Sequence, residues 1–178
     1  MGDELSMQTQ IIILDDDPTG IQTVHGCLAL TCWDAETLCR AFEDACPFFY
    51  VLTNTRAYAR EQARQIVVDA VQAIVTVNRA YQRRLVFISR SDSTLRSHFP
   101  LEIDSITQRI EQDTGQPMDA IFLVPAFFEG GRITRDDTHY LWDGCAYIPT
   151  SDTEFARDAV FGYTSSHLPT YIEKAGRG

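Results

Sequence analysis

Three consecutive aspartates, Asp15, Asp16 and Asp17, are the first residues of this 178-residue sequence that suggest chemistry. They follow a short apolar run and precede a Pro-Thr-Gly turn. Three adjacent carboxylates repel one another, so they need an arginine, a metal ion or backbone N–H groups nearby. Such carboxylates can accept a proton from a substrate hydroxyl or bind Mg²⁺, whereas an Asx turn or helix cap would explain only one of them. We therefore interpret the run as part of a functional site.

A second polar segment, from Arg90 to Arg96, combines two arginines, an aspartate and three hydroxyl groups. It precedes a helix that we expect to begin near Ser97. Hydroxyls and main-chain N–H groups at a helix start, flanked by arginine, make a good anion site, and a helix cap needs only one hydroxyl. Arg56 and Arg132 are further candidates, although an isolated arginine is more often an ion-paired surface residue. The candidate binding residues of the segment are Arg90, Asp92, Ser93, Thr94 and Arg96.

Familiar cofactor motifs do not occur in the sequence. It has neither G-x-x-x-x-G-K-[ST] nor G-x-G-x-x-G, and the pair Gly130-Gly131 without a phosphate-loop lysine is typical of an ordinary turn. The four histidines lack metal-ligand spacing and the five cysteines form no C-x-x-C pair. We expect structural or exposed histidines and reduced thiols.

Alternating strands and helices must position these residues. Short apolar runs predict buried strands, and apolar residues at i, i+3 and i+4 predict amphipathic helices between them. This alternation predicts an α/β fold with a doubly wound, mainly parallel sheet flanked by helices. The expected strands are residues 11–14, 27–31, 48–52, 85–89 and 120–124. The expected helices are residues 34–45 with Asp34 as N-cap, residues 58–79, and a helix with Pro100 in its first turn that ends near Gly115.

The pattern changes after residue 124. Residues 133–139 and 146–148 predict a β-hairpin with a turn at Trp142-Asp143-Gly144, and periodicity is weak after residue 150. We expect one domain over residues 1–178, with a core at about 10–149 and an extension at 150–178.

Polar residues are concentrated in the connections that follow the expected strands. The carboxyl ends of parallel strands lie at one edge of a sheet, where such folds bind ligands. We therefore expect these connections to meet and form a pocket for a small anion, with Asp17 and Arg96 close together. The polar connections are residues 15–20, 53–56, 90–96 and 125–132.

Composition excludes several classes of partner. A net charge of -10 argues against nucleic acid, because phosphate backbones are bound mainly by Lys and Arg. No apolar run approaches the length of about 20 residues that a membrane helix needs, and the acidic N-terminus is unlike a signal peptide. We expect a cytoplasmic protein.

Five motifs, taken in order, resemble the N-terminal domain of the four-carbon acid sugar kinase family. They are LDDDPTGIQTVHG, TNTRA, SRSDSTLRSHFPLE, VPAFFEGGRIT and TSDTEFARD, and they cover residues 11 to about 172. The resemblance implies an N-terminal α/β domain that binds a sugar acid such as threonate or erythronate, and a C-terminal domain that binds ATP. This chain would lack the C-terminal domain, so ATP and Mg²⁺ would be held mainly outside it and no cofactor is expected in this chain alone.

The resemblance also implies roles for individual residues. Asp16 and Asp17 match the paired acids that face the substrate, and we expect Asp17 to accept the proton of the attacking hydroxyl. The segment from Asp92 to Arg96 matches the family's D-S-T-L-R element, and Arg132 matches the arginine of its G-R element. Arg96 and Arg56 are expected to hold the substrate carboxylate. The chain departs from many members in having Arg90 in place of lysine and Ser97 in place of glycine.

Two other interpretations remain open at this point. Asp15, Asp17 and Thr19 also form the D-x-D-x-T of haloacid-dehalogenase-like phosphatases, in which Asp15 would be the nucleophile and Mg²⁺ obligatory. That interpretation is incomplete, because the only lysine is Lys174 and no late acidic pair follows a strand. Alternatively, the chain is a non-catalytic domain that binds sugar acids.

A domain separated from its C-terminal partner would expose the apolar surface of the cleft between them, so a homo-oligomer is also expected.

Overall fold

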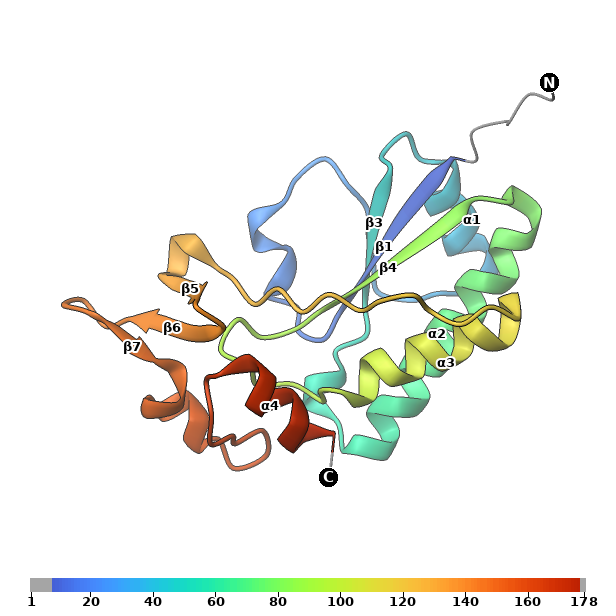
Figure 1. Cartoon of the computed structure of the whole chain (residues 1–178). Coiled ribbons are helices and arrows are strands. Elements are labelled where there is room, and N and C mark those ends of the chain that lie inside the picture. The colour runs from blue at the N-terminus through green and yellow to red at the C-terminus, as the bar shows by residue number, and fades with distance from the viewer. Residues whose placement is uncertain (1–7, 177–178) are drawn as a thin grey trace, which may run out of the picture. The chain divides into compact units, whose positions relative to one another are not determined.

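The structure is a computed structural model that describes residues 8–176 (Figure 1). The described residues fall into two compact units. The first unit comprises residues 8–90 and 102–116, and the second comprises residues 91–101 and 117–176. Each unit has its own cluster of buried hydrophobic side chains.

A four-stranded parallel sheet forms the centre of the first unit. Its order is β2-β3-β1-β4, and all three strand pairs are parallel. The strands expected around residues 11–14, 27–31, 48–52 and 85–89 are all present, which confirms the α/β prediction. Their bounds are β1 (Thr9–Asp15), β2 (Ala29–Leu30), β3 (Phe48–Leu52) and β4 (Arg84–Arg90).

Three helices accompany this sheet, close to their predicted places. Asp34 caps the first, because its side chain accepts the N–H of Thr37 at 3.0 Å. The third helix begins at Leu101, later than the start near Ser97 that the sequence predicts. The bounds are α1 (Ala35–Glu43), α2 (Arg60–Tyr81) and α3 (Leu101–Thr114).

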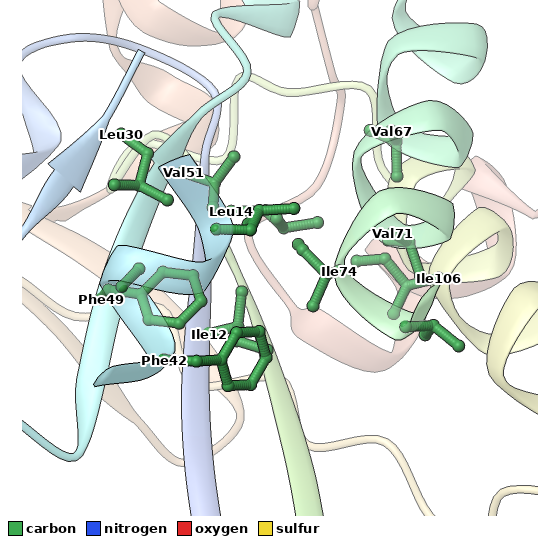
Figure 2. Close-up of a cluster of buried hydrophobic side chains, with 13 residues drawn as sticks. Ile12, Leu14, Leu30, Phe42, Phe49, Val51, Val67, Val71, Ile74 and Ile106 are labelled. Carbon is green, nitrogen blue, oxygen red and sulfur yellow. The ribbon is translucent and has the colours of Figure 1, made fainter. Parts of the chain in front are cut away.

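Apolar side chains from these helices pack with those of the sheet to form the first core (Figure 2). Phe42 of α1 is fully buried, and its ring packs edge-to-face with that of Phe49, with the ring centroids 5.6 Å apart. Burying a side chain of this size contributes about 1.5 to 3 kcal/mol to the free energy of folding, so the core stabilises the packing of β1 and β3. The labelled core residues are Ile12, Leu14, Leu30, Phe42, Phe49, Val51, Val67, Val71, Ile74 and Ile106.

The strand predicted at residues 120–124 is wrong. These residues belong to neither sheet of the described chain, and Phe122 and Val124 are 87% and 79% exposed. An apolar run becomes a strand only where a neighbouring strand accepts its hydrogen bonds. The parallel sheet ends at β4 instead.

The second unit contains a three-stranded antiparallel sheet of order β5-β6-β7. The hairpin predicted near residues 133–148 is present, but its first strand is divided. Asp136 and Asp137 both have positive φ, 49° and 59°, as the centre of a type I′ turn requires. Aspartate tolerates this conformation better than most residues, so the chain turns between β5 and β6. The bounds are β5 (Arg132–Arg135), β6 (Thr138–Trp142) and β7 (Tyr147–Pro149).

Residues after 150 complete the second unit. They form two short 3₁₀ helices, η4 (Thr150–Asp152) and η5 (Glu154–Arg157), and a final helix α4 (Leu168–Ala175). Leu168 and Tyr171 of α4 pack with Leu95 in the second hydrophobic cluster. Within residues 8–176, no helix has the length and apolar character that crossing a membrane would require.

Candidate functional site

The aspartate run lies where β1 ends, in the first unit. Asp15 is the last residue of β1, and its carbonyl accepts the N–H of Thr53 at 2.9 Å, just beyond β3. The N–H of Asp16 donates to the carbonyl of Arg90 at 3.2 Å, at the end of β4. The carboxyl ends of three parallel strands therefore meet here, as predicted for these strands. The fourth predicted connection, residues 125–132, does not follow a strand of this sheet, because residues 120–124 form none.

Arginines offset the charge of the aspartates. Arg56, in the 3₁₀ helix η2 (Thr55–Ala57), binds Asp16 with two nitrogens, Nη2 at 2.7 Å and Nε at 3.2 Å. Its Nη1 lies 3.5 Å from Asp17 Oδ2. Arg90 Nη1 lies 3.3 Å from Asp15 Oδ1. Two arginines predicted as site residues thus lie against the aspartate run.

Burial divides the three aspartates. The side chains of Asp15 and Asp16 are 0% and 2% exposed, whereas that of Asp17 is 25% exposed. Burial raises the pKa of both Asp15 and Asp16 to about 6, even though Arg90 and Arg56 lower it. For Asp17, partial burial raises the pKa, but hydrogen bonds from Thr19 outweigh this and hold it below its usual value. At neutral pH, Asp17 is the ionised carboxylate that solvent reaches.

The turn after the run depends on glycine. Thr19 donates its N–H to Asp17 Oδ1 at 2.8 Å, which forms the Asx turn. Gly20 then passes so close to Asp15 that a Cβ atom would lie 2.1 Å from Oδ2. That Oδ2 atom is buried and has no hydrogen-bond partner among the described residues. Asp15 is therefore enclosed by the turn and turned away from solvent.

Glu102 is a residue of this region that was not among the predicted site residues. It lies in the first turn of α3 and is only 5% exposed. Its carboxylate accepts hydrogen bonds from the hydroxyls of Thr55 and, at 3.2 Å, Ser89. Burial raises its pKa. A charged residue in the first turn of an amphipathic helix is ordinarily solvated, so sequence alone offers no signal of this burial.

The D-S-T-L-R segment forms a second cluster, in the second unit. Arg96 Nε donates to Asp92 Oδ2 at 2.9 Å and to Thr94 Oγ1 at 3.1 Å, and Thr94 also donates to Asp92. Because α3 begins only at Leu101, the helix N-terminus predicted beside this segment at Ser97 is not there. Side chains rather than a helix end therefore define this cluster.

Two residues of the C-terminal extension complete the environment of Arg96. Its guanidinium lies 4.8 Å from the ring centroid of Phe155, and its Nη1 lies 3.6 Å from Asp158 Oδ2. Both residues belong to the fifth motif, TSDTEFARD, to which sequence analysis assigned no role. Asp158 itself is fixed, because its Oδ1 accepts the N–H groups of Val160 and Phe161.

Ser93 and Arg132, the other predicted site residues of the second unit, make contacts with residues outside the cluster of Asp92, Thr94 and Arg96. The Ser93 carbonyl lies 2.7 Å from Nε2 of His139, a fully buried histidine whose Nδ1 lies 3.0 Å from Thr134 Oγ1. His139 is thus structural, as expected. Arg132 begins β5 with its guanidinium 5.6 Å from the ring centroid of Phe127, and its Nε is buried without a hydrogen-bond partner among the described residues.

The predicted site residues therefore form two groups. Asp16, Asp17, Arg56 and Arg90 gather in the first unit, and Asp92, Thr94 and Arg96 gather in the second. The predicted proximity of Asp17 and Arg96 involves both units and stays a prediction. Within residues 8–176, no three His, Cys, Asp or Glu side chains are arranged to hold a metal ion. The Asp16 and Asp17 carboxylates face arginine, so they do not fit Mg²⁺ binding.

The chain thus contains an α/β sheet unit and carboxylate–arginine clusters in both units. A family model described as the sugar-binding N-terminal domain matches residues 11–178. The chain belongs to this family. This confirms the resemblance found in the motifs.

Individual relatives agree with this assignment. D-threonate kinase of Bordetella bronchiseptica is 33% identical over 125 residues, which are 68% of this chain and 27% of the kinase. A crystal structure of a domain of unknown function from Bordetella bronchiseptica, a domain-swapped dimer with bound citrate, is 30% identical with a TM-score of 0.62. The match covers 93% of this chain and 40% of that one.

A Haemophilus influenzae protein of known structure is similar in fold, with a TM-score of 0.61 at 13% identity over 92% of this chain and 38% of its own. The chain thus spans well under half the length of each of these three relatives.

Proposed function

We propose that this chain is the substrate-binding domain of an ATP-dependent, cytoplasmic kinase that phosphorylates a four-carbon or similarly small sugar acid. Its family membership and its similarity to D-threonate kinase support this proposal. The observation that carries it is Asp17, an ionised and partly exposed carboxylate held beside Arg56 at 3.5 Å. Such a group can accept a proton from a hydroxyl while the arginine limits its charge.

In the proposed reaction, the sugar acid lies with its reactive hydroxyl toward Asp17 and Asp16. Arginine binds carboxylates through two parallel hydrogen bonds, so Arg96 and Arg56 are the proposed anchors of the substrate carboxylate. The remaining proposed contacts come from Arg90, Asp92, Ser93, Thr94 and Arg132. Phosphoryl transfer depends mostly on positioning and charge neutralisation, which these preformed ion pairs supply.

ATP and Mg²⁺ are proposed to bind mainly to a separate C-terminal nucleotide-binding domain. The chain alone would bind the sugar acid but would not catalyse its phosphorylation.

The crystallised relative is a domain-swapped dimer, which supports a homo-oligomer here as well. Light scattering that gives the mass of a dimer would support the oligomer, and a monomer mass would contradict it.

The phosphatase interpretation is not favoured by the geometry. A nucleophile must reach its substrate, but Asp15 is 0% exposed, pairs with Arg90 and packs against Gly20. Asp15 is therefore a structural carboxylate in this conformation.

Isothermal titration of the chain with D-threonate and D-erythronate tests the proposal. We expect binding by the wild type and a loss of affinity of about 10-fold or more in Arg96→Ala, because a charge-assisted hydrogen bond is removed. Arg40→Ala is the matched control. Arg40 forms an exposed ion pair with Glu36, so this variant should bind the sugar acid with wild-type affinity. Undiminished binding by Arg96→Ala would remove Arg96 from the site. Absence of sugar-acid binding, together with Mg²⁺-dependent hydrolysis of p-nitrophenyl phosphate, would favour the phosphatase instead.

A further inference from the structure

Glu102 is a buried carboxylate that the proposed function does not use. Its neighbour one helical turn along α3, Ile106, belongs to the hydrophobic core, so Glu102 occupies a position where an aliphatic side chain would ordinarily pack. Burying a carboxylate is costly unless donors satisfy it. Here the hydroxyls of Thr55 and Ser89 donate to its two oxygens, one to each.

The two hydroxyls come from the segments that carry the site arginines. Thr55 immediately precedes Arg56, and Ser89 immediately precedes Arg90. One carboxylate is therefore tied to both segments, the 3₁₀ helix η2 after β3 and the end of β4.

Those arginines in turn contact the aspartate run. Arg56 binds Asp16 through two nitrogens and approaches Asp17, while Arg90 pairs with Asp15. The positive charge of Arg56 favours the ionised form of Glu102, and it also offsets the effect of Glu102, which raises the pKa of Asp16. A tilt of either segment would displace a guanidinium from its aspartate.

We propose that Glu102 is a positioning residue for the sugar-acid site, which orients Arg56 and Arg90 against the aspartate run by anchoring Thr55 and Ser89. This inference rests on the proposed function for the identity of the ligand. The anchoring itself is a property of the free chain, so it can be measured without any sugar acid.

The first experiment follows the Nε–H signal of Arg56 by NMR in the free chain. Glu102→Leu fills the buried position but removes both acceptors, so we expect hydrogen exchange at Arg56 Nε to accelerate by about 10-fold. Glu102→Gln keeps one acceptor oxygen and should restore most of the protection. Asp104→Ala, an exposed acidic residue of the same helix, is the control variant and should change nothing.

An internal control separates positioning from a general movement of α3. Arg79 of α2 pairs with Asp113 of α3 at 2.9 Å, so a displaced helix would alter the Arg79 signal too. We expect the Arg79 signal to remain unchanged in Glu102→Leu. Unchanged exchange at Arg56, or equal changes at Arg56 and Arg79, would overturn the proposal. If Glu102→Leu does not fold, Thr55→Val removes one donor from the same contact and is judged by the same criteria.

The second experiment measures D-threonate binding by the same variants. We expect affinity about 10-fold lower in Glu102→Leu and close to the wild type in Glu102→Gln. Wild-type affinity in a folded Glu102→Leu would overturn the role in the site. If the wild type itself binds no sugar acid, the proposed function fails, while the Arg56 signal still decides whether Glu102 positions that arginine.

Discussion

At the scale of single residues, three identical side chains have been given different properties by their surroundings. Asp15 is fully buried, Asp16 forms a buried ion pair with Arg56, and Asp17 is ionised and partly exposed to solvent. The intrinsic acidity of the three is the same, so burial, hydrogen bonds and neighbouring charges separate their pKa values. The distinction assigns a structural role to Asp15 and supports the proposed reactive role of Asp17.

The raised pKa of Asp15 predicts a pH-dependent effect of Asp15→Asn on stability. Folding moves this pKa from the unfolded value of about 3.9 to about 6, so the folded state binds more protons between these values. The contribution of Asp15 to stability therefore falls as pH rises from about 4 to about 6, and stays low above. Asparagine does not titrate. The free energy of unfolding of Asp15→Asn, relative to wild type, should rise by about 2 to 3 kcal/mol between pH 4 and pH 7.5.

Urea unfolding at a series of pH values measures this difference. Asp113→Asn is a suitable control, because Asp113 forms ion pairs near the surface and lies on a different element. A difference between Asp15→Asn and wild type that stays constant with pH would show that Asp15 has an ordinary pKa.

At the scale of elements, residues distant in the sequence fix the geometry of the D-S-T-L-R segment. Arg96 lies between Asp92, four residues earlier, and the η5 region, which supplies Phe155 and Asp158 about 60 residues later. The aromatic ring supports the flat face of the guanidinium while the carboxylates bind its edge. The C-terminal extension thus contributes to the environment of a proposed binding residue.

Phe155→Leu should therefore weaken sugar-acid binding while preserving the fold. A cation–π contact at a partly exposed site contributes about 0.5 to 2 kcal/mol, so we expect affinity to fall by about 2- to 30-fold in calorimetry. Phe122→Ala is the control, because Phe122 lies in the same unit but is 87% exposed. Equal affinities of Phe155→Leu and wild type would show that the ring does not position Arg96 for binding.

At the scale of the whole molecule, the described chain has two hydrophobic clusters rather than one. The larger cluster includes Phe42, which is fully buried. Its ring stacks on that of Tyr81, with the ring centroids 5.0 Å apart. The smaller includes Leu95, Leu168 and Tyr171. Each cluster draws on residues of one unit only.

This separation predicts a local response to Phe42→Ala. Removing a buried phenylalanine costs about 3 to 5 kcal/mol, and the loss should be felt where the ring packs. Hydrogen exchange should show reduced protection of amides in β1 and β3, with amides of β6 much less affected. Equal loss of protection in both units would show instead that they unfold as one cooperative body.

Most of the regular structure could be predicted from the sequence, because local patterns encode it. Buried parallel strands appear as apolar runs, and the helix over residues 60–81 has regular apolar spacing. The same rule failed at residues 120–124, where composition indicates a tendency to be buried but not the presence of a pairing strand. It also missed the turn at Asp136 and Asp137, since two aspartates are not the usual sequence of a type I′ turn.

Sequence patterns were sufficient to predict that the carboxyl ends of β1, β3 and β4 meet, because parallel strands place these ends at one edge of a sheet. Three contacts could be found only in the folded chain: Arg56 pairs with Asp16, buried Glu102 accepts hydrogen bonds from Thr55 and Ser89, and the ring of Phe155 lies against the Arg96 guanidinium. These contacts join residues 40 or more positions apart, or depend on burial. Neither property is encoded in local spacing, since both arise only when the elements pack.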